Sequence, residues 1–140
     1  MKKKKSQVSA EFLIILSAVL VIFFLVFHLS GKREDQISSL RTRNYAAAET
    51  EKLANGINSV YLAGDGSVKN LSLPSSLKDG TNYFINIYPN SRAVLLNYTF
   101  QGNEVHVTAG LATSLIAGNI SGINSNVAIR NSNGVIYVEK

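Results

Sequence analysis

The sequence of 140 residues contains no cysteine. A chain without thiols forms no disulfide, carries no lipid on cysteine and cannot use thiol catalysis. Histidine is nearly as scarce, since only His28 and His106 are present. Neither histidine has carboxylates at the spacing of a metal site or a catalytic triad, so we interpret both as structural residues.

Groups suited to catalysis are also rare in the second half of the chain. Its few acids include Asp65, Asp79 and Glu104, and they form no paired-carboxylate arrangement. We find no glycine-rich phosphate loop and no Ser-His-Asp order. The tyrosines and phenylalanines recur at strand spacing, and we interpret them as core residues rather than as a platform for a ligand. The sequence therefore predicts that the protein is not an enzyme and has no catalytic, cofactor-binding or metal-binding residues.

The N-terminus combines a basic block with a long apolar run. Lys2–Lys5 precede the run Phe12–Leu29. As a helix these residues would span roughly 27 Å, close to the ~30 Å hydrocarbon core of a bilayer. A secretory signal peptide has a shorter apolar region of about 7–15 residues, followed by a small-residue cleavage site that this chain does not show. The lysines predict a cytoplasmic N-terminus, so we expect the rest of the chain to lie outside the cell.

Between the lysines and the apolar run, Gln7, Ser9 and Glu11 stand at alternate positions, and Ile15 follows four residues later. This order resembles the class III signal peptide of archaeal type IV pilin precursors, whose pattern reads Gln-x-Ser-x-Glu-x-x-x-Leu. The resemblance implies that a membrane-embedded prepilin peptidase cuts between Ser6 and Gln7. Two positions depart from the pattern, because Ser6 stands where that family commonly has glycine and Ile15 where it has leucine.

Cleavage would leave a hydrophobic helix that begins at Gln7. The loss of four lysines would lower the formal net charge from +5 to about +1, so we do not interpret the positive charge as a nucleic-acid footprint. In related pilins the carboxylate at the position of Glu11 is thought to neutralise an N-terminal amine during assembly. The resemblance thus implies that Glu11 pairs with the Gln7 ammonium, since a buried charge must be paired. The alternative is that Glu11 only favours the positive end of the helix dipole.

Beyond the apolar run the helical pattern continues. Between Glu34 and Ala63, apolar positions recur mostly in steps of seven, and their neighbours broaden the stripe to the width of a helix packed on a domain. These positions are Ile37, Leu40, Ala47, Leu53, Ala54, Ile57, Val60 and Tyr61. Gly64 is the expected end of the helix, with Asn55-Gly56 as an earlier alternative, and Gly31 is a position for a local bend or melted turn.

The remainder of the chain favours short strands. Alternating apolar and polar residues predict strands at 83–88, 93–100, 104–109, 127–130 and 135–138, with another within 115–120. The predicted fold is α+β, with a long N-terminal hydrophobic and amphipathic helix packed on a C-terminal antiparallel β head. We divide the chain into a basic leader (1–6), a hydrophobic helix (7–31), an amphipathic helix (32–64) and the β-rich head (65–140).

Three N-glycosylation sequons fall in the predicted head, at Asn70, Asn97 and Asn119. Strand alternation directs Asn97 away from the apolar face of its strand. Because the head is expected outside the cell, we treat all three asparagines as candidate glycosylation sites.

Together these features favour a structural subunit of an archaeal type IV pilus-like surface filament, which self-assembles through its N-terminal helix after cleavage. The expected partners are other copies of the chain, the prepilin peptidase, the pilus assembly machinery and, for the precursor, the cytoplasmic membrane. No nucleic-acid partner is predicted. Two alternatives stay open: an uncleaved single-span membrane protein that displays a β-rich binding domain, and a minor pilin.

Overall fold

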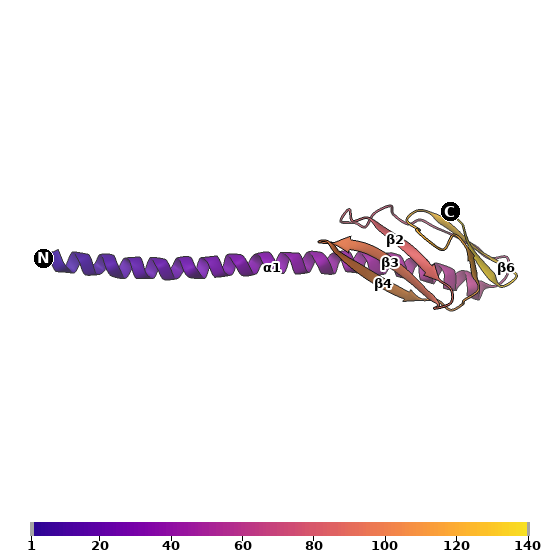
Figure 1. Ribbon diagram of the computed structural model, residues 1–140, viewed down its shortest axis with the longest axis horizontal. Helices are drawn as coiled ribbons and strands as arrows, with labels where there is room; N and C mark the ends of the chain where they lie inside the picture. The colour runs from indigo at the N-terminus through magenta and orange to yellow at the C-terminus, as the bar shows by residue number, and fades with distance from the viewer. Residues whose placement is uncertain (1, 140) are drawn as a thin grey trace. The chain divides into compact units, whose positions relative to one another are not determined.

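A computed structural model describes the backbone of residues 2–139 and the side chains of residues 10–31 and 33–139. In this part of the chain, the helix α1 (Lys2–Ala63) is followed by strands only (Figure 1). The strands are β1 (Val68–Leu71), β2 (Tyr83–Tyr88), β3 (Ala93–Phe100), β4 (Asn103–Gly110), β5 (Ile116–Gly118), β6 (Val127–Ser132) and β7 (Val135–Glu139). The predicted α+β fold is confirmed. The chain divides into two compact units, one up to Ser38 and one from Ser39 onward.

The helix α1 ends where the sequence predicts, in front of Gly64. The φ angle of Gly64 is 88°, a left-handed conformation that ends helices and that glycine adopts without steric cost. The carbonyl of Val60 belongs to the last turn and has no partner within the helix. It accepts hydrogen bonds from the Ser67 hydroxyl (2.8 Å) and from the side-chain amide of Asn131 (3.4 Å). The side chain of Asn131 therefore connects the end of the helix to the strand β6.

Neither internal glycine interrupts α1. The helix continues through Gly31, the expected position of a local bend or melted turn, and through Asn55-Gly56, the alternative end. An interior glycine costs about 1 kcal/mol relative to alanine, a penalty that a long helix with good helix formers on both sides tolerates.

The face of α1 that packs on the strands differs from the predicted stripe. Its buried residues are Thr42, Ala46, Thr50, Leu53, Ala54, Gly56, Ile57 and Val60. Three members of the predicted stripe, Ile37, Leu40 and Tyr61, are instead exposed by 49%, 59% and 37%. The prediction was wrong for these residues because it followed apolar side chains only, whereas the buried face contains two threonines.

Both threonine hydroxyls on this face have hydrogen-bond partners. The hydroxyl of Thr50 donates to the carbonyl of Ala46 (2.7 Å), and that of Thr42 donates to the carboxylate of Asp79. A buried hydroxyl is tolerated when it is hydrogen-bonded, so Thr42 and Thr50 can lie on the buried face of α1.

The strands form two sheets. The strands β2, β3 and β4 make an antiparallel sheet in that order, and the second sheet has the order β1-β6-β7-β5. The predicted strands at 83–88 and 93–100 match β2 and β3. The other predicted strands differ from β4, β5, β6 and β7 only at their ends.

Two features of the second sheet depart from the prediction. The strand β1 was not predicted, because only Leu71 among its residues is buried and its sequence shows no alternation. The strand β5 runs parallel to β7, so this sheet is mixed rather than purely antiparallel. A strand of three residues shows no sequence pattern that distinguishes parallel from antiparallel pairing. The parallel pairing of β5 with β7 depends on the path of the chain between β5 and β6.

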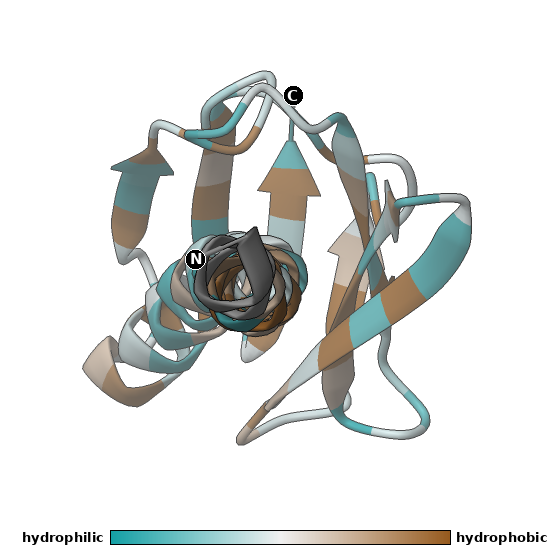
Figure 2. Cartoon of the chain, turned by 90° about the vertical axis from the view of Figure 1, so that its left-hand side faces the viewer, coloured by the Kyte–Doolittle hydropathy of each residue, from teal (hydrophilic) through white to brown (hydrophobic). Residues whose placement is uncertain are grey.

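The strands contribute alternate residues to a common core. The buried strand residues are Leu71, Tyr83, Ile85, Ile87, Val94, Leu96, Tyr98, Val127, Ile129, Asn131, Ile136 and Val138. Figure 2 shows the resulting alternation of hydrophobic and hydrophilic residues along the strands. In β4 the predicted outward residues Glu104, His106 and Thr108 are exposed, whereas Val105 and Val107 are partly buried.

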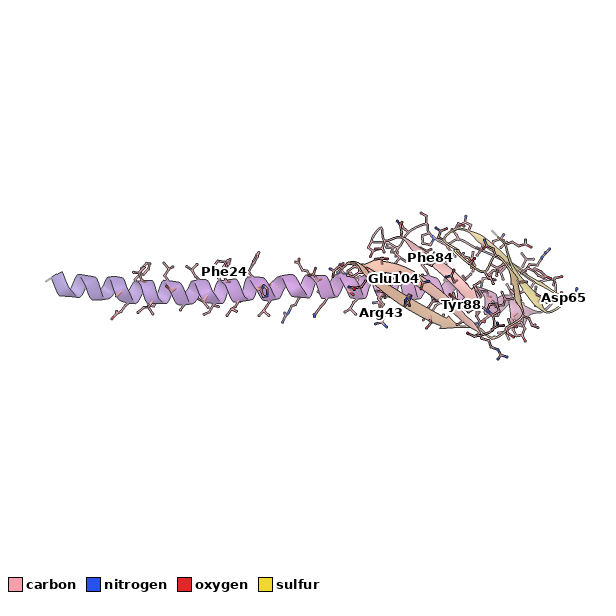
Figure 3. The ribbon with its side chains drawn as sticks, in the orientation of Figure 1. Phe24, Arg43, Asp65, Phe84, Tyr88 and Glu104 are labelled. Atoms are coloured by element: carbon pink, nitrogen blue, oxygen red, sulfur yellow. The ribbon has the colours of Figure 1, made fainter. Side chains whose placement is uncertain are left out.

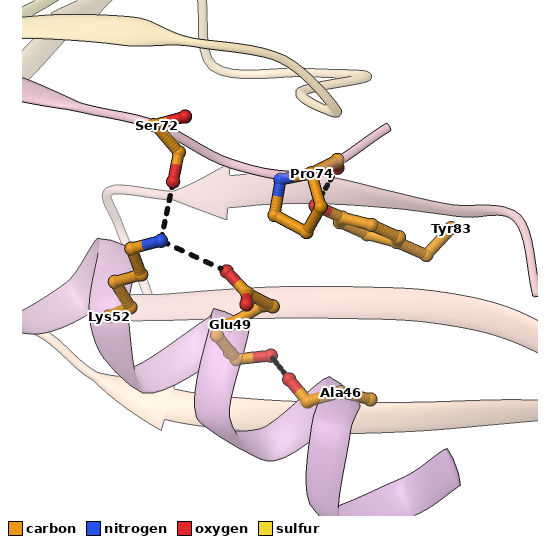
Figure 4. A network of polar contacts seen from close by, with 7 residues as sticks. Ala46, Glu49, Lys52, Ser72, Pro74 and Tyr83 are labelled. Atoms are coloured by element: carbon orange, nitrogen blue, oxygen red, sulfur yellow. Dashed lines mark hydrogen bonds and ion pairs between the residues drawn. The ribbon is translucent and has the colours of Figure 1, made fainter. Parts of the chain in front are cut away.

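Polar contacts join α1 to the segment between β1 and β2 (Figure 4). The ammonium of Lys52 donates a hydrogen bond to the carbonyl of Ser72 and lies 3.5 Å from a carboxylate oxygen of Glu49. Close by, the Tyr83 hydroxyl donates to the carbonyl of Pro74 (2.5 Å). Burial, together with the charge of Glu49, raises the pKa of Tyr83 to about 12. Tyr83 therefore keeps its proton, and remains a hydrogen-bond donor, up to a higher pH than an ordinary tyrosine.

Candidate functional site

The candidate site is the apolar segment, Phe12–Leu29 of α1. Its large hydrophobic side chains are all exposed, by 42% to 72%. Figure 3 shows side chains standing out from both sides of the helix in this segment, among them Phe24. A helix that is apolar on every side is normally found inside a protein or in a membrane. An exposed apolar surface of this extent marks a site of interaction with a protein or a membrane.

The serine hydroxyls within and beside the apolar segment are satisfied by the helix itself. The hydroxyl of Ser17 donates to the carbonyl of Leu13 (2.7 Å), and that of Ser30 donates to the carbonyl of Val26 (2.9 Å). Such bonds to the carbonyl four residues earlier make a hydroxyl independent of water. These two polar side chains are therefore compatible with an apolar environment.

By its length and composition, the apolar segment could cross a membrane. Among the described residues, one stretch of α1 is long and apolar enough to cross a bilayer, and none of that stretch is buried. A core helix of a soluble domain would be mostly buried. The finding is compatible with the predicted membrane anchor.

The residues of the Gln-x-Ser-x-Glu pattern are described only in part. Ser6, Gln7 and Ser9 belong to α1, but their side chains lie outside the described part of the structure. Glu11 and Ile15 are described and exposed, and no described side chain forms a hydrogen bond or ion pair with Glu11. Peptidase recognition and the pairing of Glu11 with Gln7 stay predictions.

The three sequon asparagines occupy different surroundings in the head. Asn70 is exposed on β1. Asn97 is half-buried on β3, where its side-chain oxygen lies 2.5 Å from Nδ1 of His106. Asn119 is half-buried directly after β5, and its backbone N–H donates to the carbonyl of Val138 (2.7 Å). Asn70 is therefore the sequon most open to a modifying enzyme.

Asp79, Arg130 and Glu139 in the β-rich unit have structural partners. Desolvation raises the pKa of Asp79, but hydrogen bonds from Thr42 and Thr81 outweigh it, and the resulting pKa lies below the ordinary value. Arg130 and Glu139 form an ion pair at 3.1 Å. Within the described residues, no group of three or more acidic or histidine side chains is placed to hold a metal ion.

The interpretation of all strand aromatics as core residues was wrong for two of them. Tyr83 and Tyr98 are buried, but Phe84 and Tyr88 are exposed by 47% and 45%. Residues 83, 85 and 87 face the core, so the period of two along a strand directs residues 84, 86 and 88 to the opposite face. That alternation was visible in the sequence and is the signal that identifies these two rings as surface residues.

The head also has two open depressions. One, of about 420 Å³, lies on the three-stranded sheet and includes Phe84 and Asn97 in its lining. The other, of about 450 Å³, lies beside β1 and β6 and includes Asn70.

Comparison of the chain with protein-family models, with curated proteins and with solved structures finds no significant match.

Proposed function

We propose that this protein is a structural subunit of an archaeal type IV pilus-like surface filament. The observation that carries the proposal is the exposed apolar segment, which begins one residue after Glu11 of the Gln-x-Ser-x-Glu motif. The rest of the chain, from Ser39, buries its own core and does not need this segment. A function that requires a large apolar surface in addition to a folded domain explains both parts.

Two different environments would cover the apolar segment in turn. In the precursor, the bilayer surrounds it while the lysines hold the N-terminus on the cytoplasmic side. After cleavage between Ser6 and Gln7, the segments of other copies replace the lipid. Full burial of one large apolar side chain contributes about 1.5–3 kcal/mol, so a bundle of such segments has a strong driving force for association once outside the bilayer.

Glu11 would define the register of this bundle. Its carboxylate is the only charge in the stretch from residue 7 to residue 31 of the mature chain apart from the new N-terminal ammonium. A buried charge needs a partner, and the ammonium of Gln7 in a neighbouring copy is of opposite sign. Pairing of these two groups would favour one axial offset between neighbouring helices.

The head would form the outer surface of the filament, where the sequons at Asn70, Asn97 and Asn119 are candidate glycosylation sites. Mature protein would therefore be extracellular, and the precursor would be in the cytoplasmic membrane. A minor pilin would share the same helix, and it would differ in abundance within the filament.

A single-span anchor for a displayed β domain is the competing function. The observation that favours it is the match between the apolar segment and the bilayer thickness, roughly 27 Å against ~30 Å. In that case the lysines would stay on the protein, and the segment would never leave the membrane.

Mass spectrometry of the mature N-terminus distinguishes the two functions. We expect a chain that begins at Gln7. A bulky replacement, Gln7→Phe, should accumulate as a membrane-bound precursor with its lysines, whereas the matched replacement Ile14→Phe within the apolar segment should mature normally. A mature wild-type protein that still begins at Met1 or Lys2 would support the anchor.

A further inference from the structure

The depression on the three-stranded sheet combines one exposed aromatic ring with several uncharged hydrogen-bonding groups. Its volume is about 420 Å³, within the roughly 300–1,000 Å³ range of small-molecule sites. The lining residues that matter here are Asn82, Phe84, Asn97, Glu104, His106 and Asn124. They come from three strands and from two connections, the one before β2 and the one between β5 and β6, so the fold assembles them from distant parts of the chain.

The strand register brings the centre of this depression together. Phe84 of β2 pairs with Asn97 of β3, which pairs in turn with His106 of β4. Directly opposed residues on one face of an antiparallel sheet have Cβ atoms about 4.5–5.5 Å apart. The phenyl ring, the amide and the imidazole therefore form one row across the sheet.

A hydrogen bond orients the amide in this row. The side-chain oxygen of Asn97 lies 2.5 Å from Nδ1 of His106. An amide oxygen only accepts, so Nδ1 of His106 must be the donor. The amide NH₂ group of Asn97 then stays available as a donor at the surface of the depression.

The loop between β5 and β6 supplies the rim and is held against β2. The backbones of Ile85 and Ile123 exchange two hydrogen bonds of 2.9 Å, and the N–H of Gly122 donates to the side-chain oxygen of Asn86 (2.9 Å). These bonds place Asn124 beside the depression without any rearrangement. A site that is already formed loses less free energy to ordering when a ligand binds.

The chemistry of the lining selects a class of ligand. In the described structure, the side chains of Asn82, Glu104 and Asn124 make no hydrogen bond, so they can donate to or accept from a ligand. No lysine or arginine lines the depression, which makes phosphate, sulfate and nucleic acid poor ligands. A neutral sugar ring fits both features, because it has an apolar C–H face for Phe84 and hydroxyl groups at its edge for amides and a carboxylate.

We propose that this depression binds one ring of a neutral glycan, with the apolar face of the sugar on Phe84 and its hydroxyls on Asn82, Asn124 and Glu104. The proposal concerns the head alone and does not depend on filament assembly. The sugar can come from two sources, a glycan presented by another molecule or a glycan attached to Asn97, whose sequon lies in the lining. Both sources present the same chemistry to Phe84.

The first arm of the test uses the full chain, produced in a bacterium without N-glycosylation and kept in a detergent without a sugar headgroup. Saturation-transfer NMR measures binding of glucose, galactose, mannose and N-acetylglucosamine, with sialic acid as an anionic comparison. We expect millimolar binding of at least one neutral sugar and weaker binding of sialic acid. Phe84→Ala should reduce the affinity at least tenfold.

Tyr88→Ala is the matched control, because Tyr88 is equally exposed on the same face of β2 but outside the lining. It should leave sugar binding unchanged, and both variants should melt at the wild-type temperature. Failure of every neutral sugar to bind, equal binding of sialic acid, or equal loss in the two variants would overturn the proposal.

The second arm identifies the source of the sugar. The intact mass of the protein from its own host is compared with that of Thr99→Ala, which removes the sequon but keeps Asn97. A glycan mass that disappears in the variant assigns the depression to the attached glycan. Equal masses assign it to a glycan from another molecule.

Discussion

Gly56 of α1 lies directly against the side chain of Leu71 in β1. A Cβ atom on Gly56 would come within 2.3 Å of Leu71 Cδ1 and within 3.2 Å of Ile129 Cδ1. The side chain of Leu71 thus occupies the space that a Cβ atom at position 56 would need. In the sequence, Gly56 is a candidate for the end of the helix. In the fold it lies inside the helix and packs against β1.

Replacement of Gly56 by valine should therefore destabilise the head. The added atoms fit only if the side chains of Leu71 and Ile129 shift, and overpacking of a core typically costs about 1–3 kcal/mol. Thermal unfolding followed by circular dichroism should show a lower midpoint for Gly56→Val. The control Asn55→Val makes the same kind of change at an exposed neighbour, and an equal effect of both variants would mean that the contact with Leu71 is unimportant.

Asp79 should make the stability of the head depend on pH in the acid range. Hydrogen bonds from Thr42 and Thr81 place its pKa in the folded protein below the ordinary 3.8. The stabilisation that ionised Asp79 contributes is therefore fully present above a pH of about 3.8, its pKa in the unfolded chain. It is lost as the pH falls through the lower pKa of the folded state. Asp79→Asn should be less stable than wild type at neutral pH and should lose less stability on acidification.

Melting temperatures measured across this pH range test the assignment. The control Glu51→Gln changes an exposed carboxylate on α1 and should follow the wild-type pH dependence. An unchanged pH dependence in Asp79→Asn would show that the titration of Asp79 does not contribute to the acid sensitivity of the head.

Glu11→Ala should block assembly without affecting maturation. Loss of one partner of a buried ion pair costs about 3–5 kcal/mol, and this penalty would apply to each subunit added. We expect the alanine variant to be cleaved and folded but absent from filaments, and Glu11→Asp to be intermediate. Glu34→Ala removes the same charge beyond the apolar segment and should assemble. Abundant filaments of the alanine variant, seen by electron microscopy, would reduce Glu11 to a helix-dipole residue.

Removal of the residues before Ser39 should leave a soluble folded monomer. The shortened chain keeps the buried face of α1, including Ala46, Leu53 and Ile57, and loses the exposed apolar segment. A chain that starts at Gly66 loses that face as well, and each large side chain contributes about 1.5–3 kcal/mol through burial. It should aggregate or stay unfolded in chromatography and circular dichroism. If the two fragments unfolded with equal cooperativity, α1 would not be part of the core.

Local patterns were enough to predict most elements of the fold. The two-residue alternation predicts β2 and β3 to the residue, and it places Glu104 and His106 on the outside of β4. The strand β1 was not predicted, because its residues do not alternate between buried and exposed and so leave no two-residue pattern in the sequence. The parallel partner of β5 depends on the path of a loop, and no local signal encodes that path.

The sequence by itself determined the apolar segment, the Gln-x-Ser-x-Glu pattern and Gly64 as the expected end of α1, because each of these is a feature of consecutive residues. Only the tertiary structure decided which face of α1 is buried, since Thr42 and Thr50 become core residues through hydrogen bonds that composition does not reveal. It also decided that Phe84, Asn97 and Asn124 share one depression. Contacts between residues far apart in the chain depend on strand register and loop path, which are properties of the whole fold rather than of any local pattern.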